Sequence, residues 1–548
     1  MKRNGSPTDC RRRGVLMHVS SLPSEYGIGT FGRQAYRFID MLRESGACVW
    51  SVLPLGPTGF GDSPYQSFSS FALNPYFLDL EQLCEKGFLT REECESVDWG
   101  PDPSSCDYAA LYGGRMPLLM TAYARAMLQP EVLSKLHSFA EENPHIRDYA
   151  LFTAIKAYEG GKPWYEWEPE LRARKPKALR AMARKVDCEC RYHLFVQQQL
   201  YEQWDALHAY AAENGVELMG DMPIYCAYDS ADCWAHADMF QLDAELRQTS
   251  VAGVPPDYFC ELGQRWGNPL YDWQKLRRTG YKFWLERMAA AARLYDILRI
   301  DHFRGFEAYY AIPASSPDAR QGEWRKGCGY ELFKRFKAMQ ERGEAPMCEI
   351  VAEDLGFITP NVKRLLTRTG FAGMQVLQFA FDGSRKNPHL NKKWDGDPQH
   401  IVNKVCYTGT HDNPPIAAWW PTVSEAERRR VMKYCGIKGR RLSDAICRLY
   451  PCDEQELADC GETKEECEFA QSYMRLQCSR AAFALCCAAA ECNAEMILLP
   501  LQDVLCLGAE ARMNTPSVQE GNWRWRITEE QMPAAEKNMG RIFRSERE

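Results

Sequence analysis

Eight short apolar segments, most of them ending in polar residues, constrain the fold of this chain more than any other feature. They have the length and apolarity of buried strands, and segments with helical spacing join most of them. Eight strands that alternate with helices indicate an α/β fold, a (β/α)8 TIM barrel. In order, the segments are GVLMHVSS (14–21), CVWSVLPLG (48–56), VELMGDMPIY (216–225), ILRIDHF (297–303), CEIVAED (348–354), MQVLQFAF (374–381), VCYTGTHD (405–412) and EMILLPLQD (495–503).

The connections between these segments are very unequal in length. About 160 residues separate the second from the third, and large gaps follow the third and seventh. We expect one catalytic barrel over 1–548, with large, mainly helical insertions in its βα loops at about 57–214, 223–295 and 413–492. Insertions on this face of a barrel would wall a long groove, as a polymeric substrate requires.

Composition excludes several classes of function. The net charge is -7, and the short basic clusters are mixed with acids, so nucleic acid is not an expected partner. No apolar stretch follows the basic first residues as in a signal peptide, and the longest apolar run, 481–490, has 10 residues and is too short to span a bilayer. We expect a cytoplasmic protein that does not enter membranes.

The cysteines also suit a cytoplasmic protein. There are 23, an odd number, scattered without a C-x-x-C pair. Without an export signal they are expected to be reduced thiols that serve as small core residues. The sequence therefore predicts no structural metal.

The stretch LRIDHFRGF (298–306) places two arginines, an aspartate and a histidine directly after an apolar strand. If 297–303 is a strand, then Arg299, Asp301 and Phe303 share one of its faces. A neighbouring guanidinium stabilises the ionised aspartate that a carboxylate nucleophile needs. A buried structural ion pair is the alternative for this stretch alone.

Further acids follow two other strands of the predicted barrel. The fifth strand ends in Glu353 and Asp354, and the seventh in His411 and Asp412. Any one of them could be a helix cap or a surface residue, but together they converge on one rim. Paired carboxyl groups, one attacking the anomeric carbon and one donating a proton to the leaving oxygen, perform glycoside chemistry.

Sugar sites also need flat aromatic faces, and two loops supply them. GFGDSPYQSFSSFALNPY (59–76) follows the second strand, and GVPPDYFCELGQRWGNPLY (253–271) follows the third. Packing within irregular loops is the alternative for each ring. The candidates for exposed rings are Tyr65, Tyr258, Phe259 and Trp266.

One motif suggests a different class of enzyme. GIGTFG (27–32) has the G-x-G-x-x-G pattern of dinucleotide-binding folds and lies between a strand and a helix. The intervening SLPSEY breaks the tight turn that would present a pyrophosphate, and the next strand ends in LPLG, without an acid for a ribose. We interpret the motif as structural and expect no cofactor.

From about residue 13 to Arg526, the chain resembles the 4-α-glucanotransferases of the amylomaltase or disproportionating-enzyme type, glycoside hydrolase family 77. The blocks that carry the resemblance are SSLPSEYGIGTFG, SPYQSFSSFALNPY, GDMPIY, YDSADCWAH, VAGVPPDYF, GQRWGNPLY, LRIDHFRGF, AEDLG, GTHDN, PLQDVLCLGAEARMNTP and GNWRWR. The resemblance implies Asp301 as the nucleophile, Glu353 as the general acid and base, and Asp412 as the residue that stabilises the transition state.

The resemblance also implies residues that hold the sugar, and it places the acceptor loop within 223–295. Departures from the family pattern at Cys260, Cys506, Ser517 and Val518 affect the expected loop shape and leave the catalytic carboxylates in place. The implied sugar contacts are Asp62, Tyr65, Asp221, Tyr258, Phe259, Gln264, Trp266, Arg299, His302 and His411.

Two alternatives remain for the function. A retaining hydrolase of α-1,4-glucans shares the first half-reaction and differs in using water as the acceptor. A glucan-binding protein without catalysis would lack at least one carboxylate, and all three are present. The expected ligands are α-1,4-glucans and maltooligosaccharides, bound by a monomer or homodimer.

Overall fold

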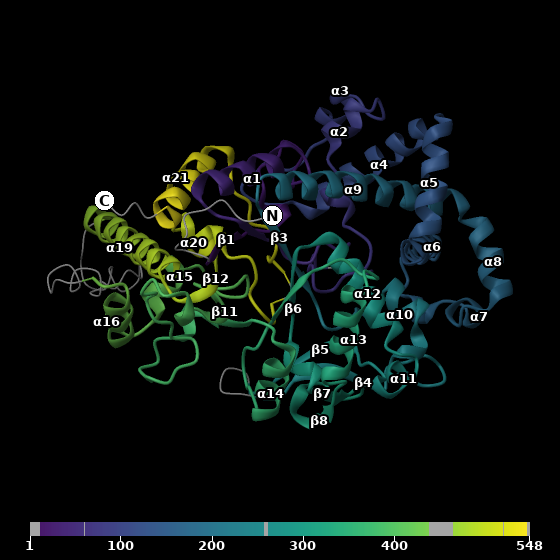
Figure 1. The fold of residues 1–548 in the computed structure, drawn as a ribbon. Coiled ribbons are helices and arrows are strands. Elements are labelled where there is room, and N and C mark those ends of the chain that lie inside the picture. Colours follow the sequence, from purple (N-terminus) through teal and green to yellow (C-terminus); the bar gives the residue numbers. More distant parts are fainter. Residues whose placement is uncertain (1–10, 60, 257–260, 438–463, 519, 545–548) are drawn as a thin grey trace.

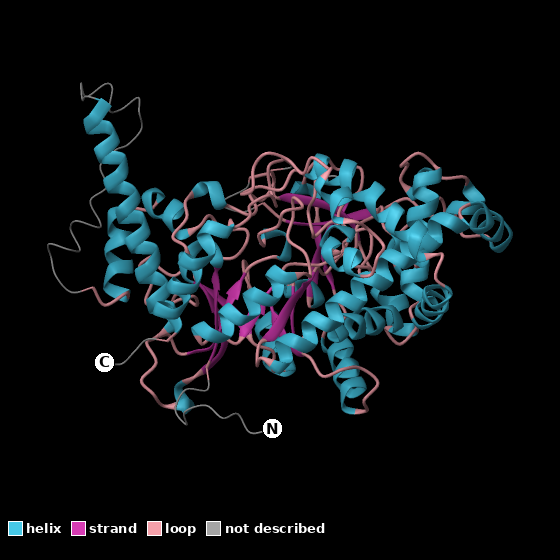
Figure 2. Cartoon of the chain, turned by 90° about the horizontal axis from the view of Figure 1, so that it is seen from above, coloured by secondary structure: helices cyan, strands magenta, loops and turns pink. Residues whose placement is uncertain are grey.

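The computed structural model describes residues 11–59, 61–256, 261–437, 464–518 and 520–544. All eight predicted strands are present and pair in parallel in one sheet, around which the helices lie (Figures 1 and 2). The strands are β1 (Arg12–Leu16), β2 (Val49–Ser51), β3 (Glu217–Met222), β6 (Ile297–Ile300), β9 (Glu349–Ala352), β10 (Gly373–Val376), β11 (Val402–Tyr407) and β12 (Ala494–Pro500).

The sheet closes on itself. Its strand order is β10-β11-β12-β1-β2-β3-β6-β9, so the first and last strands of the chain are neighbours. Between β9 and β10, Val351 and Ala372 form a parallel bridge, and the N–H of Ala352 donates to the Ala372 carbonyl at 2.8 Å. The fold is therefore the predicted (β/α)8 barrel.

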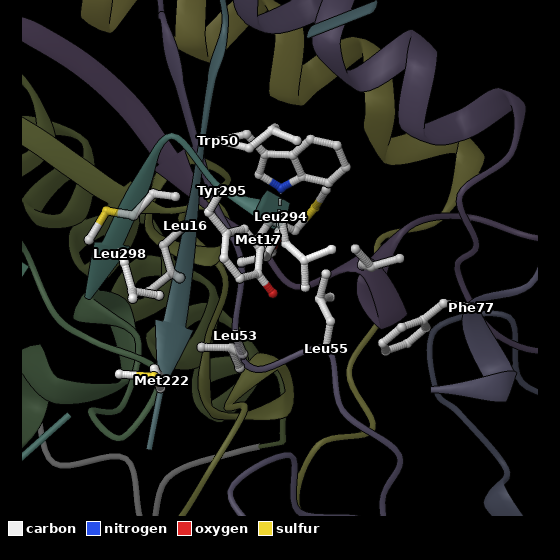
Figure 3. Close-up of a cluster of buried hydrophobic side chains, with 14 of the residues drawn as sticks. Leu16, Met17, Trp50, Leu53, Leu55, Phe77, Met222, Leu294, Tyr295 and Leu298 are labelled. Atoms are coloured by element: carbon white, nitrogen blue, oxygen red, sulfur yellow. Dashed lines mark hydrogen bonds between the residues drawn. The ribbon is translucent and has the colours of Figure 1, made fainter. Parts of the chain in front are cut away.

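Large apolar side chains fill the space around the strands. Figure 3 shows Trp50 on β2 packed near Tyr295, which precedes β6. The Trp50 indole N–H donates to the Met17 carbonyl at 2.8 Å, so its one polar group is satisfied inside the core. Both rings are almost completely buried. Their packing connects β2 with the start of β6, the strand that ends at the candidate active site.

Much of the rest of the described chain is helical, as the helical spacing between the apolar segments predicted. Helices α2 to α9 all lie between β2 and β3, and Figure 1 shows α5 to α8 far from the barrel strands. Among the residues described, none of the helices combines the length and apolarity needed to cross a bilayer. The helix bounds are α1 Arg33–Ser45, α2 Leu80–Glu85, α3 Arg91–Glu95, α4 Tyr108–Ala126, α5 Pro130–Glu142, α6 Pro144–Tyr158, α7 Pro169–Arg172, α8 Pro176–Lys185, α9 Asp187–Glu213, α10 Ala231–Ala235, α11 Trp273–Arg278, α12 Lys282–Leu294, α13 Tyr330–Glu341, α14 Pro360–Thr369, α15 Ile416–Trp419, α16 Glu425–Tyr434, α19 Lys464–Ala490, α20 Leu501–Val504 and α21 Met532–Phe543.

A second, antiparallel sheet was not predicted from the sequence. It has the order β5-β4-β7-β8 and combines the segments that follow β3 and β6 (Figure 1). Its strands are short and contain Gly, Pro and several charged residues, so they lack the alternation that marks a strand. The strands are β4 (Ser250–Val254), β5 (Gln264–Pro269), β7 (Ala308–Pro313) and β8 (Glu323–Lys326).

The GIGTFG motif packs against the protein's own chain. The Thr30 hydroxyl donates to Asp79 Oδ2 at 2.6 Å, and a Cβ added to Gly32 would lie 1.8 Å from the same oxygen. A carboxylate therefore lies against the loop where a dinucleotide motif would hold phosphate, and its charge would repel an anion. This geometry supports the structural interpretation of the motif.

Replacing Gly29 by alanine is expected to lower the free energy of unfolding by about 2–3 kcal/mol. An added Cβ would lie 1.9 Å from the Val19 carbonyl oxygen and 2.7 Å from Leu22 Cβ, so the backbone must move. Urea denaturation would measure the loss. Gly113 is the matched control, because it lies inside α4 with nothing within 4 Å of an added Cβ; its alanine variant should gain about 0.5–1 kcal/mol. Equal stability of the Gly29 variant and the parent would contradict the expectation.

Candidate active site

Arg299, near the end of β6, lies between two carboxylates. Its Nη1 is 2.5 Å from Asp221 Oδ2 on β3, and its Nη2 is 3.1 Å from Asp301 Oδ1. The backbone N–H of Asp301 donates to the Met222 carbonyl at 3.0 Å, which ties the end of β6 to β3. The Asp221 side chain is 4% exposed and that of Asp301 is 30% exposed, so Asp301 is the carboxylate that a ligand can reach.

Glu353, directly after β9, is held by backbone groups. The N–H of His302 donates to its Oε2 at 2.8 Å, and the N–H of Leu355 donates to its Oε1 at 2.7 Å. His302 adopts a left-handed conformation, with φ 47° and ψ 50°, which directs its N–H toward this carboxyl group. The backbone conformation after Asp301 therefore positions Glu353 next to β6.

The same left-handed residue corrects one sequence expectation. Strand β6 ends at Ile300, so the alternation predicted for 297–303 does not continue to Phe303. The Phe303 ring is buried and lies 5.4 Å from Phe333 and 6.0 Å from Phe371, centroid to centroid, in the layer outside the strands. Phe303 therefore does not share the face of Arg299 and Asp301.

The environment of Glu353 favours its protonated form. Burial raises the pKa of Glu353 to about 8, and the nearby charge of Asp301 contributes to the rise, while Arg299 opposes it. Asp354, the next residue, turns away from this group. Its Oδ2 is 2.6 Å from Lys404 Nζ in a partly buried ion pair, so it has a structural partner of its own.

Asp412, after β11, receives hydrogen bonds from the segment that follows β12. The side-chain amide of Asn514 donates to its Oδ1 at 2.6 Å, and Arg512 donates to its backbone carbonyl at 3.0 Å. His411 Nε2 lies 3.3 Å from the same Oδ1. The Asp412 side chain is nevertheless 46% exposed, so it remains open to a ligand.

The rings of Tyr65, His411 and Trp523 pack together next to Asp412 and Asp221. The Tyr65 ring stacks on His411 with centroids 5.1 Å apart and an interplanar angle of 17°, and Trp523 lies 5.9 Å from both rings. The Tyr65 hydroxyl donates to Asp221 Oδ2 at 2.7 Å, which links the 59–76 loop to the Arg299 network. Tyr65 is half-buried, so it is less exposed than its loop composition suggested.

Trp266 lies on β5, next to His302. Its ring meets His302 edge to face at 5.0 Å, and its indole N–H donates to the Gln264 side chain at 3.0 Å. Asp62 has a positive φ of 56° and lines a small cavity together with Tyr108 and Trp523. Tyr258 and Phe259 lie outside the described residues.

Three residues of this site were not singled out from the sequence: Arg512, Asn514 and Trp523. They come from the irregular segment after β12, where periodicity gives no signal. The blocks ARMNTP and GNWRWR, which contribute to the family resemblance, contain all three and were the available clue.

Replacing Asn514 by alanine is expected to lower kcat/KM for the reaction proposed below by about 10- to 100-fold. The change removes a hydrogen bond to a charged carboxylate, worth roughly 1.5–3 kcal/mol. Steady-state kinetics would measure it. Asn403→Ala is the control, because that side chain donates to the Gly370 carbonyl near the start of β11 and should leave kcat/KM within twofold. Similar losses in both variants would contradict a role for Asn514 at Asp412.

The chain is similar to known proteins over nearly its whole length. The family model described as 4-alpha-glucanotransferase matches residues 17–531. A 4-alpha-glucanotransferase of Thermus thermophilus is 44% identical over 521 residues, covering 94% of this chain and 95% of that protein. One of Streptococcus pneumoniae is 42% identical over 536 residues, covering 96% of each.

Structural similarity points the same way. The structure of an amylomaltase from Streptococcus agalactiae in complex with acarbose superposes with a TM-score of 0.84 at 32% sequence identity, covering 97% of this chain and 98% of that one. The match includes the barrel and the insertions between its strands. Together with the matched sequence range, it establishes that this chain belongs to the 4-alpha-glucanotransferase family of glycoside hydrolase family 77.

Proposed function

We propose that the protein is a 4-α-glucanotransferase that moves a segment of an α-1,4-glucan onto glucose or a maltooligosaccharide, with retention of configuration. The observation that carries the proposal is the contrast between two carboxyl groups. Asp301 lies against the Arg299 guanidinium, and the pKa of Glu353 is raised to about 8. One carboxylate suited to attack and one carboxylic acid suited to proton donation are what a retaining mechanism requires.

In the first half-reaction, an Asp301 oxygen attacks the anomeric carbon of the donor. The bond from that carbon to the leaving glucan oxygen breaks, and Glu353 gives its proton to this oxygen. The products are a covalent glucosyl ester on Asp301 and a shortened glucan. The positive charge of Arg299 stabilises the ionised Asp301 carboxylate before attack and keeps its oxygen oriented.

In the second half-reaction, the acceptor hydroxyl takes the place of the departed glucan. The Glu353 carboxylate removes its proton while its oxygen attacks the anomeric carbon and Asp301 leaves. We assign to Asp412 the stabilisation of the positive charge that develops on the sugar. We assign sugar contacts to the other ten residues implied by the resemblance: Asp62, Tyr65, Asp221, Tyr258, Phe259, Gln264, Trp266, Arg299, His302 and His411.

Incubation of the purified protein with maltotriose alone tests this proposal. Chromatography should resolve glucose together with a ladder of maltooligosaccharides longer than the substrate. Maltose and glucose with nothing longer would identify a hydrolase instead. An unchanged trisaccharide that still binds would identify a glucan-binding protein, so either result would overturn the proposal.

A further inference from the structure

Two exposed aromatic side chains lie together beside the candidate active site. Trp324, on β8, is 40% exposed, and Phe357, in the loop between β9 and α14, is 78% exposed. The guanidinium carbon of Arg304 lies 3.7 Å from the centroid of the Trp324 ring and 5.9 Å from that of Phe357. Arg304 therefore connects two rings that come from distant parts of the chain.

Contacts within the protein hold Trp324 and Phe357 in place. Arg304 Nη1 donates to the Phe357 carbonyl at 2.8 Å, and the Arg304 side chain is buried. On β8, Trp324 pairs with Tyr310 of β7, and the two ring centroids are 5.1 Å apart. These contacts restrain Trp324 and the backbone of Phe357 before any ligand arrives, which lowers the entropic cost of binding.

The position of these rings follows from the residues that hold them. Arg304 is two residues from His302, whose N–H binds Glu353, and Phe357 is four residues from Glu353. Four residues span at most about 15 Å, so a short oligosaccharide bound at Glu353 can reach both rings. In Figure 1, β7, β8 and α14 lie close together, in agreement with the contacts of Arg304.

We assign this region to the acceptor of the proposed reaction, because the resemblance places the acceptor loop within 223–295, the segment that contains Trp266. Tyr65, His411 and Asp412 come from the loops after β2 and β11, whereas Trp266 and the two exposed rings belong to the small sheet and the loop after β9. Glu353 donates its proton to the leaving oxygen, so the glucan that departs lies next to Glu353. The acceptor later occupies the same path. Trp266 contacts His302, whose N–H binds Glu353, and it belongs to the same small sheet as Trp324.

We propose that Trp324 and Phe357, positioned by Arg304, form an acceptor subsite for a glucan, beyond the sugar next to the cleaved bond. The inference rests on the proposed function. Flat ring faces bind the apolar face of a pyranose, and charged neighbours can bind its hydroxyls. Glu323 and Lys326 on the same strand are exposed, which suits a hydroxyl-rich ligand better than a broad apolar protein interface.

Acceptor kinetics test the subsite. The full-length protein would be given α-maltosyl fluoride as donor and either glucose or maltotetraose as acceptor, for the parent and for Trp324→Ala and Phe357→Ala. We expect KM for maltotetraose to rise roughly tenfold in each variant, while KM for glucose changes less than twofold. Tyr158→Ala, which removes a 55% exposed ring at the end of α6, should change neither value. Equal changes for both acceptors, or none, would overturn the subsite.

A binding measurement separates this inference from the proposed function. In the background of Asp301→Asn, titration calorimetry with maltoheptaose should give a dissociation constant roughly tenfold higher when Phe357→Ala or Trp324→Ala is added. This measurement needs no turnover. Unchanged affinity in both double variants would overturn the subsite even if transfer is found, and weaker affinity would support it as a glucan site even if transfer is not.

Discussion

The Asp301→Asn variant is expected to lose at least ~10³-fold in kcat for maltotriose disproportionation while its affinity for maltoheptaose changes little. An amide cannot form the glucosyl ester, so the first half-reaction stops. The fold should tolerate the change, because Arg299 keeps Asp221 as a partner at 2.5 Å. Glucose release would measure kcat, and titration calorimetry would measure binding.

Asp318→Asn is the matched control for this variant. Asp318 also pairs with an arginine, Arg320, at 2.7 Å, but both residues belong to the turn before β8, where Asp318 caps residues 319–321. Its variant should keep full activity. If Asp301→Asn retained more than about a tenth of the parent kcat, Asp301 would not be the nucleophile.

The second large effect concerns Glu353 and pH. Since burial and Asp301 raise the pKa of Glu353 to about 8, the group is protonated at neutral pH. In the parent, kcat/KM should therefore fall as the pH rises through about 8, where the acid loses its proton. Glu353→Gln should lower kcat/KM with maltotriose by about 10²- to 10⁴-fold and remove this alkaline limb.

An activated donor separates the two roles of Glu353. Fluoride leaves without a proton, so glucosyl-enzyme formation from α-maltosyl fluoride should survive in Glu353→Gln, whereas transfer to a sugar hydroxyl should stay slow. Azide, which needs no base, should restore turnover. Glu349→Gln is the control, because Glu349 is the first residue of β9, the strand that Glu353 follows, and it pairs with Arg12 at 2.7 Å. An unimpaired reaction of Glu353→Gln with maltotriose would exclude Glu353 as the acid.

The barrel was predictable because its strands are largely buried on both faces and therefore consist mostly of apolar residues. The small sheet was not, since strands such as β5, QRWGNP, contain polar residues and end in proline. Its strands become a sheet only through pairing between segments that follow different barrel strands, a tertiary effect that no local window contains.

Some residues of the candidate site could be predicted from the sequence and others could not. Asp301, Glu353 and Asp412 were visible because each follows a recognisable strand. Asn514 was not, because its importance depends on one hydrogen bond to a residue about a hundred positions earlier. The left-handed backbone of His302 was also hidden, since only the position of Glu353 above the neighbouring strand explains it.

The pairing of β1 with β12 has a consequence for how the protein is made. Arg12 lies opposite Met496, so the ribosome must complete almost the entire chain before β1, which can pair early with β2, finds its second neighbour β12. At ordinary rates of synthesis this delay is on the order of a minute, during which the edges of the sheet are open to chaperones or to aggregation. The Asn514 contact to Asp412 forms later still. A nascent chain therefore carries its carboxylates long before it has the geometry to act on a glucan.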